Sequence, residues 1–117
     1  MAEANQIESV IILGAGPAGL SAALYAARGE LHPLVFTGMQ PGGQAALTDS
    51  IENYPGFPDG VGGVELGELF QKQAERFGAR IEYDVVTSVD FSTKPFRINT
   101  YSREYRAETV IIATGAS

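Results

Sequence analysis

The chain begins and ends with short apolar runs of the kind that form strands buried inside a sheet. Ile7–Leu13 is rich in β-branched residues, and Thr109–Ala113, close to the last residue, has the same character. Short apolar runs of this kind are typical of parallel strands, which are covered on both faces. We therefore predict that these two segments are parallel strands of one sheet.

Between these strands the apolar pattern twice takes the period of an α-helix. In the first helix Pro17 suits the opening turn, Gly29 suits the exit, and the apolar positions are Leu20, Ala23, Leu24 and Ala27. In the second, Gly78 closes an amphipathic stretch marked by Leu66, Leu69, Phe70, Gln73 and Phe77. We therefore expect two helices that each bury one face.

Four further segments complete the predicted fold. Pro33–Phe36 and Ile81–Tyr83 are short strands that each follow a predicted helix, and the first of them completes a βαβ unit. Val85–Phe91 and Phe96–Asn99 predict an antiparallel insert of about three strands. The expected fold is one α/β domain over residues 1–117, a Rossmann-like, doubly wound parallel sheet in the order 3-2-1-4 with a small antiparallel insert.

Three glycines follow the first strand with the spacing G-x-G-x-x-G. Gly14 would allow a tight turn, Gly16 would let a pyrophosphate approach the backbone, and Gly19 would let the helix pack close to the strand. A purely structural turn is the alternative. The position of these glycines between a strand and a helix favours nucleotide binding.

The acidic residue that usually follows the second strand in such folds is missing. Thr37 and Gly38 stand in its place, so backbone groups or the Thr37 hydroxyl would have to hold a ribose. The long segment 37–63 then follows, rich in glycine and proline, and a connection of this length is usually functional. Its Gly43 could expose a backbone N–H, and the Gln44 and Asn53 amides could read a polar ring, although each amide could equally be an ordinary turn residue.

Composition narrows the possible functions. The 117 residues carry a net charge of −6 and no run of basic residues, which argues against nucleic acid and against an anionic membrane surface. No apolar segment approaches the roughly 20 residues of a membrane span, and the first residues do not form a signal peptide, so a cytoplasmic location is expected.

The sequence offers almost no group that could break a covalent bond. It has no cysteine, and its only histidine, His32, lies beside Pro33 in a predicted loop without an acidic partner. Serines lack an evident base, and acidic residues lack metal-ligand spacing. We therefore predict no catalytic residue and no metal site, and a chain that holds a cofactor.

Four motifs, in this order and spacing, resemble the FAD domain of bacterial-type thioredoxin reductases. They are Gly14-Ala15-Gly16-Pro17-Ala18-Gly19, Thr37-Gly38-Met39-Gln40-Pro41-Gly42-Gly43-Gln44, Glu52-Asn53-Tyr54-Pro55-Gly56-Phe57-Pro58 and Ala113-Thr114-Gly115-Ala116-Ser117. The likeness covers nearly the whole chain. The resemblance implies the first piece of an incomplete, discontinuous FAD domain from an enzyme in which electrons pass from NADPH through FAD to a dithiol and then to thioredoxin.

The resemblance also implies a role for each candidate residue. The pyrophosphate would be lined by Gly14, Gly16, Pro17 and Ala18. The ribose would lie at Thr37 and Gly38, and the adenine at the backbone of Val86. The ribityl chain and flavin would lie near Gly43, Gln44 and Asn53, and the dinucleotide would be closed by Ala113, Thr114 and Gly115.

What the chain lacks relative to this family leads to further expectations. Without the cysteine pair and the NADPH domain, the chain alone should be inactive, and FAD should be held weakly or not at all. The strand Thr109–Ala113 would be an unpaired edge, which predicts a homo-oligomer or contact with another chain. Two other interpretations stay open: a truncated or engineered nucleotide-binding module without activity, and the FAD segment of a related flavoprotein disulfide reductase.

Overall fold

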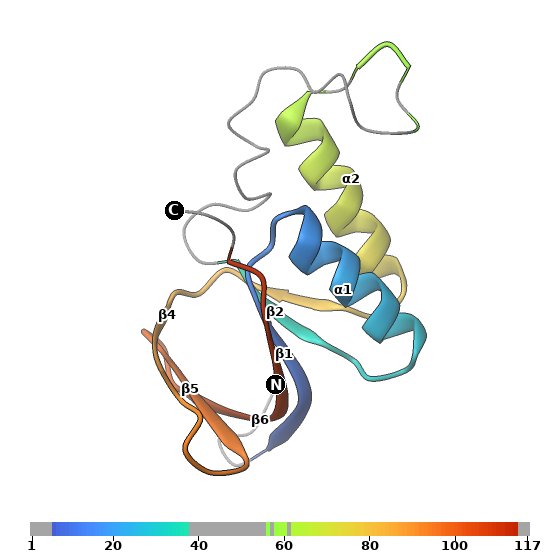
Figure 1. The fold of residues 1–117 in the computed structure, drawn as a ribbon. Coiled ribbons are helices and arrows are strands. Elements are labelled where there is room, and N and C mark those ends of the chain that lie inside the picture. The colour runs from blue at the N-terminus through green and yellow to red at the C-terminus, as the bar shows by residue number, and fades with distance from the viewer. Residues whose placement is uncertain (1–5, 38–55, 57, 61, 115–117) are drawn as a thin grey trace.

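A computed structural model describes residues 6–37, 56, 58–60 and 62–114. Its described part contains one six-stranded sheet in the order β3-β2-β1-β6-β5-β4 and two helices (Figure 1). The strands are β1 (Ile7–Leu13), β2 (Leu34–Phe36), β3 (Arg80–Glu82), β4 (Val86–Asp90), β5 (Phe96–Thr100) and β6 (Glu104–Ile112). The helices are α1 (Pro17–Arg28) and α2 (Gly63–Arg76). Neither helix is long and apolar enough to cross a membrane, as far as the described residues show.

The parallel part of the sheet confirms the predicted strand order. β1 lies in the middle and pairs in parallel with β2 on one side and with β6 on the other, while β3 pairs in parallel with β2. With β6 counted as the fourth parallel strand, this is the predicted order 3-2-1-4. The two apolar runs from opposite ends of the sequence therefore lie side by side at the centre of the sheet, with Ile12 opposite Ile111.

The antiparallel insert differs from its prediction in one respect. The third antiparallel strand and the last parallel strand are not separate, because β6 is one continuous strand of nine residues. Its first half pairs antiparallel with β5 from Glu104 to Ala107, and from Arg106 onward it also pairs in parallel with β1. The alternation of polar and apolar residues in Glu104–Glu108 belongs to the half that pairs with β5, and the apolar run follows in the same strand.

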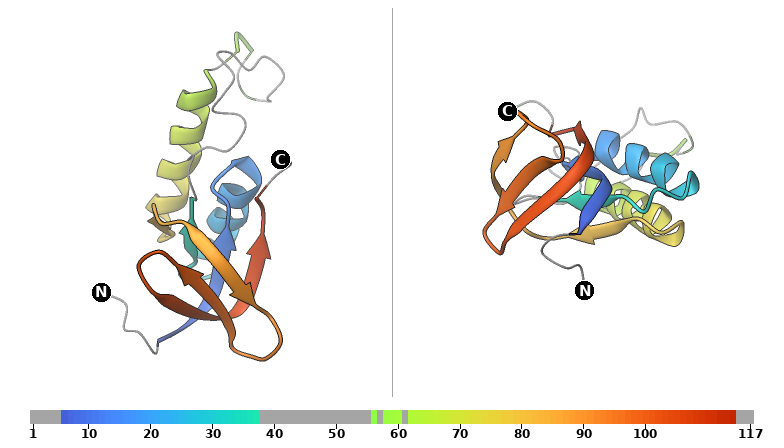
Figure 2. Two further views of the ribbon diagram at one scale, coloured as in Figure 1. Left: turned by 90° about the vertical axis from the view of Figure 1, so that its left-hand side faces the viewer. Right: turned by 90° about the horizontal axis from the view of Figure 1, so that it is seen from below.

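The two faces of the sheet are covered by different kinds of element. Both α1 and α2 pack on one face, and the antiparallel strands curl over the other (Figures 1 and 2). Alternate residues of β1 supply the two cores, since Val10 and Ile12 face the helices and Ile11 and Leu13 face the curled strands. On the second face the rings of Phe36 and Tyr105 meet edge to face with centroids 4.9 Å apart.

The helix ends follow the predicted glycines, with one local difference. α2 is followed by Phe77 and then by Gly78, which has a left-handed φ of 107°. α1 ends at Arg28 as predicted, but Gly29 has an ordinary φ of −83°. The left-handed residues of this exit are instead Glu30 and His32, with φ of 63° and 50°. His32 is exposed in a loop, as expected.

A partly buried ion pair joins β1 to β3 across β2 at the start of the parallel strands. The side chain of Glu8 is 4% exposed, and its Oε1 lies 2.6 Å from Nη2 of Arg80 on β3. The same nitrogen donates to the backbone carbonyl of His32 at 2.5 Å. A buried carboxylate needs such a partner, because an unpaired charge in the interior is strongly destabilising.

Candidate nucleotide-binding site

A groove lies at the carboxyl ends of the parallel strands, next to the start of α1. It encloses about 260 Å³ and is lined by Gly14, Phe36, Thr37, Val85, Val86 and Thr114. Gly14 follows β1, Phe36 ends β2, and Thr37 follows it. Val85 precedes β4, Val86 begins it, and Thr114 lies after the end of β6. Four chain segments that are far apart in the sequence therefore converge on one hollow.

The topology of the sheet explains why a hollow forms at this place. From β1 the chain proceeds to β2 and β3 on one side of the sheet, and it later returns to β6 on the other side of β1. β1 is thus the strand at which the order of the parallel strands reverses, with β2 on one side and β6 on the other. Open α/β sheets bind their ligands at such a switch point, where the divergence opens a crevice.

Gly14 makes the tight turn that was predicted for it. Its φ is +115°, a conformation that other residues rarely adopt. A Cβ atom at Gly14 would lie 2.3 Å from the carbonyl oxygen of Ala113, so a side chain has no room there. The Gly14 N–H donates to the carbonyl of Phe36 at 2.9 Å, which fixes the turn against the end of β2.

Gly19 lets α1 pack directly against that turn. A Cβ atom at Gly19 would lie 1.9 Å from the carbonyl oxygen of Gly14 and 3.6 Å from the Cβ of Ala113. The helix therefore starts at the end of the strand with no side chain between them. This is the close packing for which the sequence predicts a glycine at this position.

Gly16 differs from the other two glycines because its backbone is ordinary. It is the N-cap of α1, with φ of −75° and ψ of −175°, which any residue can adopt. No side chain caps the helix, and the first intrahelical bond runs from the Leu20 N–H to the Gly16 carbonyl at 2.9 Å. The N–H groups of Ala18 and Gly19 therefore point out of the first turn without an intrahelical acceptor. Such a helix start favours an anion.

Thr37 occupies the place where many dinucleotide-binding folds carry an acidic residue. Its side chain is 7% exposed and lines the groove, and its N–H donates to the carbonyl of Glu82 at 3.1 Å. This bond joins the ends of β2 and β3. The backbone of Thr37 is therefore fixed at the groove.

The structure brings some of the predicted site residues together. The residues that line the groove are Gly14, Thr37, Val86 and Thr114. Ala113 precedes Thr114, and its N–H donates to the carbonyl of Leu13 at 2.8 Å. At the start of α1 are Gly16, Pro17 and Ala18. Outside the described residues are Gly38, Gly43, Gln44, Asn53 and Gly115.

Two lining residues were not among the predicted site residues. Phe36 was predicted only as the last residue of a strand. Because β2 ends at the edge of the sheet where the groove lies, its last residue also lines the groove. Val85 precedes the predicted Val86, and no motif marks it. Both follow from the topology, because the carboxyl end of β2 and the entry to β4 meet at the same edge.

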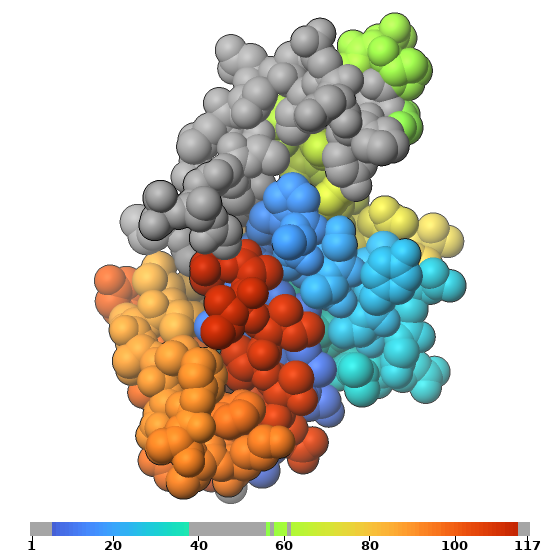
Figure 3. Space-filling view, in the orientation of Figure 1, coloured from blue at the N-terminus to red at the C-terminus, as the bar shows by residue number. Residues whose placement is uncertain are grey.

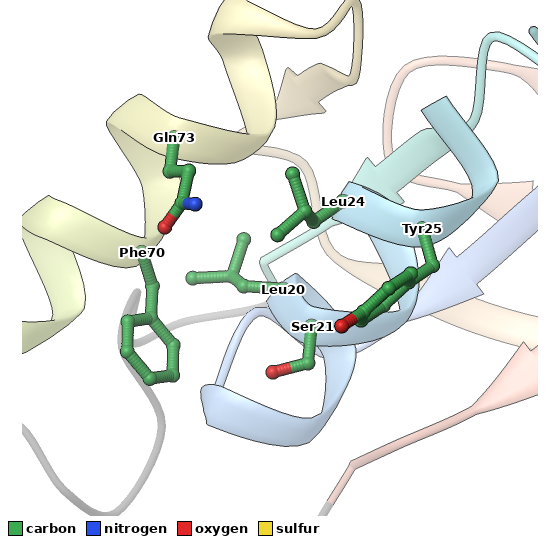
Figure 4. Close-up of a pocket in the computed structure, with 6 residues that line it drawn as sticks. All are labelled: Leu20, Ser21, Leu24, Tyr25, Phe70 and Gln73. Atoms are coloured by element: carbon green, nitrogen blue, oxygen red, sulfur yellow. The ribbon is translucent and has the colours of Figure 1, made fainter. Parts of the chain in front are cut away.

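A second hollow lies between α1 and α2, away from the strand ends (Figure 4). It encloses about 190 Å³ and is lined by Leu20, Ser21, Leu24, Tyr25, Phe70 and Gln73. None of the predicted site residues lines it. Within the described part of the chain, no group of three or more His, Cys, Asp or Glu side chains could hold a metal ion.

Taken together, the glycine turn, the uncapped helix start and the groove at the switch point define a nucleotide-binding α/β domain. The family model for pyridine nucleotide-disulphide oxidoreductases matches residues 8–117. The chain therefore belongs to this family, and the resemblance that the four motifs carry is confirmed.

Individual relatives place the likeness more closely. The chain is 54% identical over 108 residues to a thioredoxin reductase of Rickettsia bellii, covering 92% of this chain and 35% of the relative. The crystal structure of thioredoxin reductase from Streptococcus pyogenes superposes with a TM-score of 0.89 at 40% identity, covering 97% of this chain and 37% of that chain. The chain thus spans about a third of the length of these relatives.

One relative bears a different name. A glucosaminate ammonia-lyase of Pseudomonas fluorescens is 50% identical over 108 residues, covering 92% of this chain and 34% of the relative. The likeness to this protein is almost as strong as the likeness to the thioredoxin reductase. Similarity over this segment therefore establishes the family more firmly than it establishes one activity.

Proposed function

We propose that the chain is the FAD-binding segment of an NADPH-dependent thioredoxin-disulfide reductase. When bound, the flavin of such an enzyme takes electrons from NADPH and passes them to a dithiol. The observation that carries the proposal is the start of α1, which has no side-chain cap and lies beside a groove at the carboxyl ends of the parallel strands. The names of the relatives support the assignment to thioredoxin reductase.

The described residues fit the ADP half of FAD. The N–H groups of Ala18 and Gly19 would receive the pyrophosphate, and the glycines at positions 14 and 16 would let it approach. Thr37 would hold the ribose by hydrogen bonding, and Val86 would meet the adenine through its backbone. The remaining candidates keep their expected roles, with Pro17 at the pyrophosphate and Ala113 and Thr114 closing over the dinucleotide.

The other half of the cofactor involves residues that the structure does not describe. Gly43, Gln44 and Asn53 would approach the ribityl chain and flavin, Gly38 the ribose, and Gly115 the dinucleotide. The chain has no cysteine, and reduction of a disulfide by exchange needs a thiolate. The dithiol, the NADPH site and the contact with thioredoxin would therefore come from other parts of the enzyme, whose expected location is the cytoplasm.

A second candidate function follows from the relative with a different name. The chain could be the FAD segment of a family member whose reaction is set by other parts of the protein, as the similarity to the ammonia-lyase suggests. A nucleotide-binding module without activity is the third interpretation. The reductase and the other family member would bind FAD at the same site. A Cys-x-x-Cys pair in the full protein would distinguish the reductase from the other two interpretations.

We expect the 117-residue chain to bind ADP and FAD with dissociation constants within about tenfold of each other, a difference of about 1.4 kcal/mol. The described contacts all lie on the ADP half, so the flavin half should add little. Isothermal titration with ADP, FAD and riboflavin measures this, and riboflavin, which lacks the pyrophosphate, should not bind. Absence of both ADP and FAD binding would refute the proposal, and FAD binding far tighter than ADP binding would refute the expectation that the flavin half adds little.

We also expect the chain to associate with itself through the outer edge of β6. Among the described residues, the strand from Thr109 to Ile112 pairs with β1 on one side only, and Ile112 is 63% exposed. The end of this strand lies at the surface between α1 and the antiparallel strands (Figure 3). An apolar edge without charge or proline is a template for strand pairing.

Sedimentation velocity over a hundredfold range of concentration tests this association. A shift from monomer to dimer or a larger species is expected, and Ile112→Lys should return the chain to the monomer, because it places a charge at the exposed end of the edge. A monomer at the highest concentration would contradict the expectation.

A further inference from the structure

The carboxylate of Asp84 lies in the short connection that leads from β3 into the nucleotide groove. β3 ends at Glu82 and β4 begins at Val86, so the connection consists of three residues. The Oδ1 atom of Asp84 accepts a hydrogen bond from the N–H of Val85 at 2.9 Å. Val85 is one of the residues that line the groove. The side chain of Asp84 therefore holds a backbone group of the groove wall.

A turn from a distant part of the sequence holds the other side of Val85. The carbonyl oxygen of Val85 accepts from the N–H of Tyr101 at 3.3 Å. This turn is closed by Thr100, whose Oγ1 accepts from the N–H groups of Ser102 at 3.2 Å and Arg103 at 3.1 Å. Both backbone polar groups of Val85 are thus bonded, one to Asp84 and one to the turn, and its orientation is fixed.

The charge state of Asp84 fits this role. The side chain of Thr100, together with the hydroxyl and N–H of Ser102 and the N–H of Val85, holds the pKa of Asp84 below its ordinary 3.8. A group with a lowered pKa in the folded state stabilises that state above its unfolded pKa and loses this contribution as the pH falls through the lowered value. At neutral pH Asp84 is therefore a carboxylate, which accepts the hydrogen bond of the Val85 N–H.

The strand that follows departs from regular pairing directly after the groove. The register of β4 against β5 shifts between Val86 and Ser88, which marks a bulge. The Oγ1 of Thr87 donates to the carbonyl of Asn99 at 3.1 Å at this position. Bulges redirect the backbone and are frequent beside functional sites. Residues 84–87 are thus bent away from a regular strand where they meet the groove.

We propose that Asp84 is a positioning residue that sets the base preference of the nucleotide site. It holds Val85 and so orients the next residue, Val86, and both residues line the groove on the side of β4. The backbone groups of Val85 are used within the chain, but successive residues of a strand direct their N–H and carbonyl groups to opposite sides, so those of Val86 would face away from β5 at the edge of the sheet. In a fixed orientation the Val86 groups would discriminate between base edges, because adenine and guanine present opposite donors and acceptors at position 6. This inference rests on the proposed function, since it takes the ligand to be an adenine nucleotide.

The chain provides a matched control at the other end of β4. Asp90 also has a lowered pKa, chiefly because of its hydrogen bond with the hydroxyl of Ser92. Its Oδ1 accepts from the Ser92 N–H at 2.9 Å and from the Ser92 Oγ at 2.6 Å. Asp84 and Asp90 are thus two carboxylates that hold local backbone groups, one before the start of β4 and one at its end, and of the two only Asp84 adjoins a residue that lines the groove.

The experiment compares the wild type with Asp84→Ala, Asp84→Asn and Asp90→Ala by isothermal titration with ADP and GDP at pH 7. The wild type should prefer ADP. In Asp84→Ala the affinity for ADP should fall about tenfold, the usual effect of losing a charge-assisted hydrogen bond, while the affinity for GDP changes little. The ratio of the two dissociation constants should then approach one, and Asp90→Ala should keep the wild-type ratio.

Asp84→Asn covers the case in which Asp84→Ala does not fold, as judged by circular dichroism. Its Oδ1 can still accept from the Val85 N–H, but a neutral amide oxygen accepts more weakly than a carboxylate, so an intermediate ratio is expected. If the wild type prefers ADP and both Asp84 variants retain that preference, the inference about Asp84 is wrong and the proposed site stands. If the wild type binds neither nucleotide, the proposed function itself fails, and this inference falls with it.

Discussion

Replacing Gly16 by valine should weaken ADP binding at least about a hundredfold, or about 2.7 kcal/mol, while the chain remains folded. The backbone of Gly16 has an ordinary φ of −75°, so its conformation does not require glycine. The N-cap change alone should cost about 1 kcal/mol or less of stability. The side chain would instead stand where an anion must approach the N–H groups of Ala18 and Gly19.

Titration with ADP, together with a thermal melt of each variant, checks this prediction. Ser21→Val is the matched control, because it places the same β-branched side chain on the exposed face of α1 in the following turn. It should bind ADP like the wild type. Equal affinity in Gly16→Val and the wild type would show that the pyrophosphate does not meet this turn, and the assigned site would be wrong.

The sequence was sufficient to predict the parallel part of the fold, because the signals for it are local. Ile7–Leu13 and Thr109–Ala113 are apolar runs that only a central position in a sheet can bury. The helix periods between the strands leave few topologies that obey the handedness of βαβ units. The glycine turn was predictable for the same reason, since residues 14–19 occupy six consecutive positions.

The curl of the antiparallel strands could not be read from the sequence. In Glu104–Ile112 the first half alternates between polar and apolar residues, and the second half is a continuous apolar run. This change of pattern does not reveal that both halves form one strand. The face that this strand covers depends on the twist of the sheet and on the meeting of Phe36 and Tyr105, which are 69 positions apart. Contacts of that range depend on the whole fold rather than on local propensity.

The candidate site divides in the same way. The phosphate part lies in one continuous motif and was predicted, whereas Asp84 belongs to no motif. Its partner Val85 meets Tyr101 only because β4 and β5 pair. An isolated Asp in a loop is interpreted from sequence as a solvated turn residue, so its contact with the groove wall becomes visible only in three dimensions.

The second large effect is expected for Gly19→Ala, and it concerns stability. A Cβ at Gly19 would lie 1.9 Å from the Gly14 carbonyl oxygen and 2.9 Å from the Gly14 carbonyl carbon, both of which are backbone atoms. A side chain can rotate away from such a clash, but a backbone carbonyl cannot move without shifting the turn. The helix must therefore lift from the end of β1, which should lower the free energy of unfolding by about 3 kcal/mol, at the upper end for overpacked sites.

Gly29→Ala at the other end of α1 is the control for this substitution. It adds the same methyl group to the same helix, and there the nearest atom, the Ala26 carbonyl oxygen, would be 3.4 Å away. With φ of −83° at Gly29, this change should be neutral or raise the stability by up to about 1 kcal/mol. Thermal melts should show Gly19→Ala unfolding about 10 °C or more below the wild type and Gly29→Ala at or slightly above it. If both variants melt like the wild type, α1 does not rest on the glycine turn, and the start of α1 would not be held at the groove as the proposed pyrophosphate site requires.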